Sequence, residues 1–149
     1  MPLRLDTAEG VKIALLLLAL IVLGGMAYVR LAPSDPARWH VDPGQVTGGG
    51  ERRSVTLDGT PPRETLARLD AIALATPRTT RLAGSPEEGR ITWVTRSALF
   101  GFPDYTTAAA RTEGTATVLT LHARQRFGRN DLGVNGARLD AWLGLLGAP

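Results

Sequence analysis

The stretch Arg124-Gln125-Arg126-Phe127-Gly128-Arg129-Asn130-Asp131-Leu132-Gly133-Val134-Asn135 is the most chemically specific part of this chain. It joins a segment with strand-like alternation, Thr115–Arg126, to a segment with helical periodicity, Asn135–Leu146. Along the first segment, every second residue is apolar: Leu119, Leu121 and Ala123. Along the second, apolar residues recur at the spacing of one helix face: Leu139, Trp142, Leu143 and Leu146. The sequence therefore predicts a strand, a polar loop and a closing helix.

The residues before this corner predict a second helix and several more strands. A helix over 61–75 is indicated by Pro61 at its first position and by apolar residues at helical spacing. Strand candidates are 54–57, 78–82, 90–97 and 105–112, separated by turns that contain glycine or proline. We therefore expect an α+β fold, a two-layer domain of antiparallel sheet packed by two helices on one face. The other face is expected to be partly open.

An uncharged run near the amino terminus, Ile13–Val29, predicts a transmembrane helix. The run is slightly shorter than a hydrocarbon core of about 30 Å, but Leu31 and Ala32 extend it if Arg30 reaches toward the headgroups. A cleaved signal peptide has a shorter apolar region, of about 7–15 residues, and a small-residue cleavage site. The sequence favours a tail over 1–12 and an uncleaved single-span anchor over 13–32, in contact with membrane lipid.

Proline and glycine dominate the next segment, 33–53, which includes the run Gly48-Gly49-Gly50. These residues interrupt regular structure, so the sequence predicts a flexible linker over 33–53 and a soluble α+β domain over 54–149. Trp39 stands out in the linker. We expect its large apolar ring to dock on the domain, rather than to lie at the membrane interface.

Composition limits the possible functions and locations. The 149 residues contain no cysteine, which excludes disulfides, thiolate metal sites and a cysteine nucleophile, and which is compatible with an extracytoplasmic location. The net charge of +3 comes from arginines interleaved with acidic residues, so nucleic-acid binding is not expected. The short tail is the simpler part to keep in the cytoplasm. We therefore expect a single-pass protein of a bacterial inner membrane with its C-terminal domain in the periplasm.

Two interpretations of the polar residues in and around the stretch 124–135 remain open. In the first, they form a structural motif in which glycines permit unusual backbone, a side chain caps the last helix and ion pairs fix the corner. The members of this motif are Asp104, Gly128, Asp131, Gly133, Asn135 and Arg138. In the second, basic side chains on one sheet face bind a phosphate, a carboxylate or a lipid headgroup. The candidate ligand-binding residues are Arg96, His122, Arg124 and Arg126.

The block Arg124-x-Arg126-x-Gly128-x-x-Asp131-Leu132-Gly133-Val134-Asn135-x-x-Arg138, with Arg96-Ser97 and Phe102-Pro103-Asp104 upstream, resembles domain-of-unknown-function family 1499. The resemblance covers roughly residues 60–146. It implies a domain behind a membrane anchor or export signal and brings no established activity. Gln125 and Gly136 depart from the small hydroxyl and basic residues that the family often has, which weakens any ligand role that needs the full basic set.

Catalytic chemistry is not predicted from the motifs. Ser97, His122 and Asp104 could be written as a triad, but such residues occur in most domains. Nucleophile-elbow, phosphate-loop and metal-ligand spacings are not apparent, so we expect no catalytic residues, no metal and no cofactor. The sequence predicts a membrane-anchored binding or accessory module for a membrane protein complex. The alternative is a domain that binds an anion or a lipid headgroup through its arginine-rich sheet face.

Overall fold

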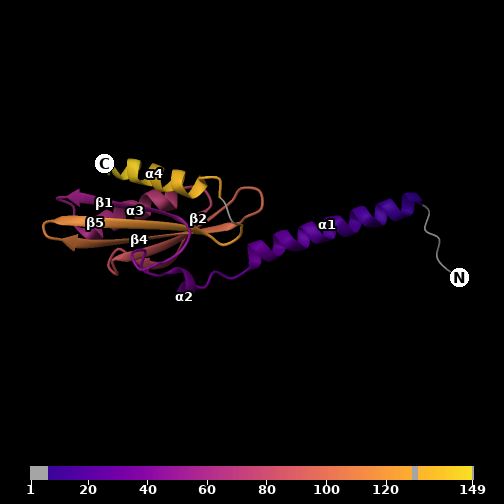
Figure 1. The fold of residues 1–149 in the computed structure, drawn as a ribbon, viewed down its shortest axis with the longest axis horizontal. Helices are drawn as coiled ribbons and strands as arrows, with labels where there is room; N and C mark the ends of the chain where they lie inside the picture. Colours follow the sequence, from indigo (N-terminus) through magenta and orange to yellow (C-terminus); the bar gives the residue numbers. More distant parts are fainter. Residues whose placement is uncertain (1–6, 129–130, 149) are drawn as a thin grey trace. The chain divides into compact units, whose positions relative to one another are not determined.

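The computed structural model describes residues 7–128 and 131–148, and divides the chain into two compact units at Ala32/Pro33. The first unit contains α1 (Thr7–Leu31). The second contains the remaining elements (Figure 1): α2 (Pro36–Trp39), β1 (Glu51–Asp58), α3 (Pro62–Ala75), β2 (Thr79–Ser85), β3 (Arg90–Arg96), β4 (Pro103–Glu113), β5 (Ala116–Gln125) and α4 (Val134–Leu146).

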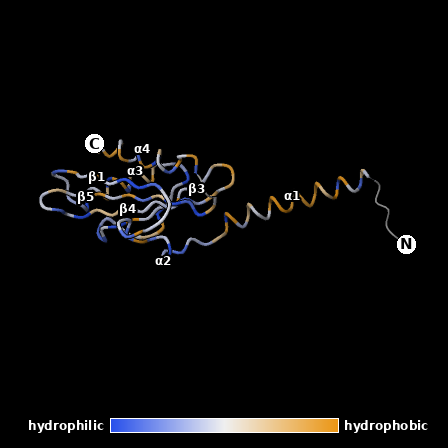
Figure 2. The backbone as a smooth tube through the Cα atoms, viewed as in Figure 1, coloured by the Kyte–Doolittle hydropathy of each residue, from blue (hydrophilic) through white to orange (hydrophobic). Residues whose placement is uncertain are grey.

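Helix α1 is long and apolar enough to cross a membrane. Its 25 residues extend for about 37 Å, which is more than the hydrocarbon core of a bilayer. Figure 2 shows the apolar character that runs along it. At its amino end, Lys12 forms an exposed ion pair with Glu9, 3.1 Å away. Charge is thus kept at the end of the helix, and its middle carries apolar side chains.

The second unit is built on a five-stranded antiparallel sheet in the order β1-β5-β4-β3-β2. The register aligns apolar residues across neighbouring strands, as in the pairs Val55↔Leu119 and Ala108↔Leu121. One irregularity interrupts the β2–β3 pairing between Arg81 and Ala83. Because side chains alternate along each strand, this register gives the sheet one continuous apolar face.

Helices α3 and α4 cover that face and enclose the main core (Figure 1). Trp93 of β3 meets Trp142 of α4 edge to face, with ring centroids 5.5 Å apart. Each indole N–H also has a partner: Trp93 donates to Asp70 and Trp142 to Thr76, both at 2.9 Å. The predicted α+β fold, with an antiparallel sheet packed by two helices behind an apolar N-terminal helix, is confirmed. The apolar helix face expected in 135–146 is confirmed as well, because its four residues are all buried in α4: Leu139, Trp142, Leu143 and Leu146.

The opposite sheet face is covered only in part. Its middle, at Tyr105 and His122, is buried, whereas Arg52, Ser54 and Thr56 of β1 stay exposed on it. α2 and the segment that follows it lie over this face. Trp39 of α2 is 5 % exposed and stacks on the buried Tyr105 of β4, with ring centroids 3.8 Å apart. The hydroxyl of Tyr105 also shares a hydrogen bond of 2.8 Å with that of Ser34. Trp39 therefore docks on the domain, as the sequence predicts.

The segment predicted as a flexible linker, 33–53, also differs from the expectation. Its first residues belong to the same compact unit as the sheet, and residues 51–53 are the start of β1. Edge pairing with β5 decides this boundary, since Glu51 lies opposite Ala123. Polar contacts hold the middle of the segment: His40 Nδ1 lies 2.9 Å from Thr92 Oγ1, and the carbonyl of Trp39 accepts from Thr107 at 3.2 Å.

Candidate functional site

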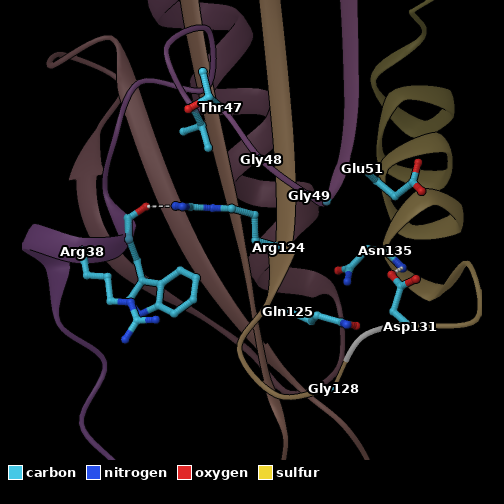
Figure 3. Close-up of a pocket in the computed structure, with 13 residues that line it drawn as sticks. Arg38, Thr47, Gly48, Gly49, Glu51, Arg124, Gln125, Gly128, Asp131 and Asn135 are labelled. Atoms are coloured by element: carbon cyan, nitrogen blue, oxygen red, sulfur yellow. Dashed lines mark hydrogen bonds between the residues drawn. The ribbon is translucent and has the colours of Figure 1, made fainter.

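A pocket of about 570 Å³ opens where residues 46–51, the end of β5 and the amino end of α4 meet (Figure 3). Its walls combine two arginines, two carboxylates, two side-chain amides and a glycine-rich backbone. The lining residues are Arg38, Trp39, Val46, Thr47, Gly48, Gly49, Gly50, Glu51, Arg124, Gln125, Gly128, Asp131 and Asn135. The pocket is therefore lined both by residues of the 124–135 stretch and by residues of the segment 33–53, which the sequence predicts to be a linker.

One wall of the pocket is cationic and is organised by Trp39. The guanidinium carbons of Arg38 and Arg124 each lie 5.0 Å from the centroid of its indole ring. Arg124 also donates to the carbonyl of Trp39 at 3.1 Å, the bond drawn in Figure 3. Burial, and then the charge of Arg38, lower the pKa of Arg124. Within residues 7–128 and 131–148, neither arginine forms an ion pair with a carboxylate, so the two positive charges are uncompensated by the domain.

Glycine is required where the chain passes over the floor of the pocket into β1. Gly50 has φ +123°, and a Cβ there would collide with the carbonyl oxygen of Ala123 and lie 2.8 Å from His122 Nε2. Arg52, two residues after Gly50, donates to the carbonyl of Val46 at 2.6 Å and fixes the course of the segment between them. The close approach of backbone to β5 explains why a small residue stands at position 50.

The other wall is formed by the start of β1 and the amino end of α4. Glu51 pairs with Arg53 at 3.2 Å. Asp131 accepts from the backbone amides of Gly133 at 3.1 Å and of Asn135 at 2.9 Å. Burial raises the pKa of Asp131, but these hydrogen bonds outweigh it and the pKa is lowered overall. Asn135 is 2 % exposed, and its Oδ1 is a buried acceptor that has no hydrogen-bond partner among the described residues.

A shielded ion pair supports the corner from the helix side of the sheet. Arg138 of α4 donates to Asp104 of β4 at 3.2 Å, and the two side chains are 9 % and 19 % exposed. Burial is the main reason that the pKa of Asp104 is raised, although Arg138 and a hydrogen bond from Asn135 act in the other direction. Asp104, Asp131, Asn135 and Arg138 thus form a connected polar group behind the pocket, beside the left-handed Gly128 and Gly133.

The four candidate ligand-binding residues do not form one surface. Arg124 lines the pocket, whereas His122 is 2 % exposed beneath residues 49–50. Burial, followed by the charges of Arg52 and Arg124, lowers the pKa of His122. Arg126 donates to the carbonyl of Pro33 at 2.8 Å, and Arg96 to that of Gly101 at 2.9 Å.

Several residues of the pocket escaped the sequence analysis: Arg38, Thr47, Gly48, Gly49, Gly50 and Glu51. The run Gly48-Gly49-Gly50, close to Arg52 and Arg53, is the one sequence signal for this part of the pocket. It lies far from Arg124 in the sequence, so the sequence does not show that the two segments meet.

The structure does not bring Ser97, His122 and Asp104 together as a catalytic triad. Asp104 faces α4, whereas His122 lies on the opposite face of the sheet, and the hydroxyl of Ser97 accepts from the amide of Phe102 at 3.0 Å. Among the described residues, no group of three His, Cys, Asp or Glu side chains could hold a metal ion.

The fold and site define a small α+β domain with a charged pocket, preceded by a helix able to span a membrane. The family described as "Protein of unknown function (DUF1499)" matches residues 32–146, and the chain belongs to this family. The resemblance drawn from the Arg124–Arg138 block is therefore confirmed. The match also includes the segment that carries Trp39 and Gly50, which the resemblance had left out. The comparison with curated proteins gave no match.

Proposed function

We propose that this protein is a single-span protein of the bacterial envelope whose domain binds a small anionic group between Arg38 and Arg124. The observation that carries the proposal is the uncompensated pair of guanidinium groups at the edge of an open pocket. Arg124 is already fixed by its bond to Trp39, so little side-chain freedom would be lost on binding. Phosphate and carboxylate oxygens match the donor geometry of such groups.

The opposite wall narrows the class of ligand. Glu51 and Asp131 would repel a polyanion and would attract a positively charged hydrogen-bond donor. A group that carries one anionic centre and one ammonium centre satisfies both walls. Phosphoethanolamine, which occurs free and as a lipid headgroup, has this chemistry, and we take it as the probe.

Binding is tested with the full-length protein in detergent, by calorimetry and thermal unfolding with phosphate, acetate and O-phosphoethanolamine. We expect O-phosphoethanolamine to bind most tightly, and Arg38→Gln to weaken its binding by about tenfold, equivalent to about 1.4 kcal/mol. Arg111→Gln is the matched control, because it removes the same charge at the far end of β4. Equal binding by the Arg38→Gln and Arg111→Gln proteins, or no binding of any probe, would overturn the proposal.

Vesicles separate the two sources of the ligand. Protein reconstituted with phosphatidylethanolamine should lose its response to added O-phosphoethanolamine if the lipid headgroup occupies the pocket. Vesicles of phosphatidylcholine, whose bulkier ammonium carries no N–H donor for Glu51 or Asp131, serve as the reference. An unchanged response in both kinds of vesicle assigns the pocket to a soluble ligand.

The proposed location places α1 in the inner membrane and the domain in the periplasm. The support is the apolar helix α1 of the described part of the chain and the absence of cysteine from the sequence. Alkaline phosphatase, which is active only outside the cytoplasm, is fused after Pro149 and compared with a green fluorescent protein fusion at the same residue. Phosphatase activity with weak fluorescence is expected, and the reverse result would contradict the location.

An accessory role in a membrane protein complex stays a prediction. Copurification from native membranes in mild detergent, with identification of proteins retained by wild type, tests it. Recovery of the protein alone would count against a stable complex.

A further inference from the structure

All three phenylalanines of the chain gather at one end of the sheet. Phe100 and Phe102 belong to the β3–β4 loop and have ring centroids 5.5 Å apart. Phe127 follows β5, and its centroid lies 5.9 Å from that of Phe102. With Leu99, which precedes Phe100 in the chain, these residues form what we call the apolar tip. Leu99 is 68 % exposed and Phe100 40 % exposed, so the tip presents large apolar side chains at the domain surface.

The loop that carries the apolar tip is held in shape by its own backbone. Ser97 and Phe102 exchange two hydrogen bonds of 3.0 Å, one from each amide. The amide of Gly101 donates to the carbonyl of Ser97 at 3.2 Å, and Arg96 donates to the carbonyl of Gly101. Exposed apolar side chains on a fixed loop are a feature of surfaces that meet another apolar medium.

The first residue of the domain lies at this same end. Arg126 donates through its backbone amide to Pro103, which follows the tip loop, and through its side chain to the carbonyl of Pro33. Helix α1 ends at Leu31, only two residues earlier. Two residues extend the chain by at most about 7 Å. A membrane crossed by α1 therefore has to lie close to the end of the sheet that carries the apolar tip.

We propose that the apolar tip inserts into the interfacial layer of the membrane that α1 crosses, as a second point of attachment. The inference rests on the membrane anchoring of the proposed function, but not on ligand binding. Arginine near the tip suits an anionic lipid surface: the guanidinium of Arg126 lies 5.3 Å from the Phe127 ring centroid. Aromatic rings and leucine are the side chains that such layers accept. The tip thus orients the domain, with its pocket edge at Gln125 and Gly128 toward the headgroups.

The absence of cysteine permits a direct test with single labelled positions in the full-length protein. Leu99→Cys reports on the tip, Thr115→Cys on the opposite end of the sheet, and Leu20→Cys on α1; all three positions are exposed. Each protein carries the environment-sensitive NBD fluorophore and is reconstituted into vesicles of phosphatidylethanolamine and phosphatidylglycerol. Lipids with a quenching nitroxide at a shallow or a deep position then report the depth of each probe.

We expect the Leu99 probe to shift to shorter wavelength and to lose emission with the shallow nitroxide. The Leu20 probe should respond to the deep nitroxide, and the Thr115 probe to neither. A Leu99 probe that behaves as the Thr115 probe does, while Leu20 is quenched, overturns tip insertion and leaves the anchor intact. An unquenched Leu20 probe overturns the anchor and tip insertion together. Shielding of Leu99 only in native membranes, and not in lipid vesicles, assigns the tip to a protein partner instead.

Discussion

The rings of Trp39 and Tyr105 lie parallel, with 9° between their planes and 3.8 Å between their centroids. Sixty-six positions separate the two residues in the sequence, so this contact closes a long loop. It also places Trp39 where its indole meets Arg38 and Arg124 and its carbonyl accepts from Arg124. One aromatic contact therefore joins the amino-terminal segment of the domain to the sheet and positions the cationic wall of the pocket.

Replacing Trp39 should destabilise the domain. Trp39→Ala removes a side chain that is 5 % exposed and leaves a cavity over Tyr105, with an expected cost of about 3 kcal/mol. Urea unfolding of the full-length protein in detergent, followed by circular dichroism, measures the change. Trp39→Phe keeps a stacking ring and should recover part of the loss. Equal stability of Trp39→Ala and wild type would show that the segment contributes nothing to the fold.

Two glycines allow backbone strain to be separated from crowding. Gly84 has φ +83°, and a Cβ there would meet the carbonyl oxygen of Arg90 and lie 2.6 Å from His40 Cε1. Gly59 has φ +73° with open space around it. Gly59→Ala should cost about 1 kcal/mol from conformation alone, and Gly84→Ala about 3 kcal/mol because overpacking is added. Thermal unfolding of the two variants checks the order, and similar values would show that the chain around Gly84 relaxes freely.

Stability should fall as the pH is lowered through the ordinary pKa of histidine. Burial lowers the pKa of His122 in the folded state, and the charges of Arg52 and Arg124 lower it further. The unfolded chain then binds more protons than the folded chain below about pH 6.5, so the stability present above this pH is lost toward the folded-state pKa. Unfolding is measured from about pH 8 to about pH 5, a range that excludes most carboxylate titration. His40 shifts in the same direction, so His122→Gln should reduce the dependence without abolishing it.

Breaking the ion pair of Arg138 with Asp104 should be costly, because the remaining carboxylate would be buried alone. We expect Arg138→Met to lower the free energy of unfolding by about 3 kcal/mol at neutral pH. Burial already raises the pKa of Asp104, so protonation at low pH should relieve part of this loss. The double variant Arg138→Met, Asp104→Asn should be more stable than Arg138→Met. If the effects of the two substitutions on the free energy of unfolding were simply additive, this would contradict a direct interaction between Arg138 and Asp104.

The sequence predicts best those elements whose periodicity is local. Leu139, Trp142 and Leu146 occupy one face of α4 as expected, since their spacing records the burial of a helix. β1 begins three residues before the expected Ser54, because Glu51–Arg53 are charged and only pairing with β5 makes them a strand. A local sequence pattern cannot predict a strand that forms only by pairing with residues about seventy positions away, as Glu51 does with Ala123.

The same limit applies to the pocket. The sequence indicates Arg124, Gly128, Asp131 and Asn135 as candidates because arginine, glycine, aspartate and asparagine are concentrated in one short stretch. Arg38 joins them only through the fold, across more than eighty positions. Alternation along β5 placed His122 and Arg124 on one face, but it could not show that Trp39 and Gly50 cover that face.

The two outer strands of the sheet have a consequence for neighbouring copies of the protein. β1 and β2 are the edges, where free backbone groups could recruit a strand from another molecule and start aggregation. β2 carries an irregularity between Arg81 and Ala83, and β1 begins with three charged residues, Glu51, Arg52 and Arg53. Both features disfavour edge-to-edge pairing. Molecules anchored in one membrane through α1, as proposed above, would meet often, and this protection would let the domains be crowded without polymerising.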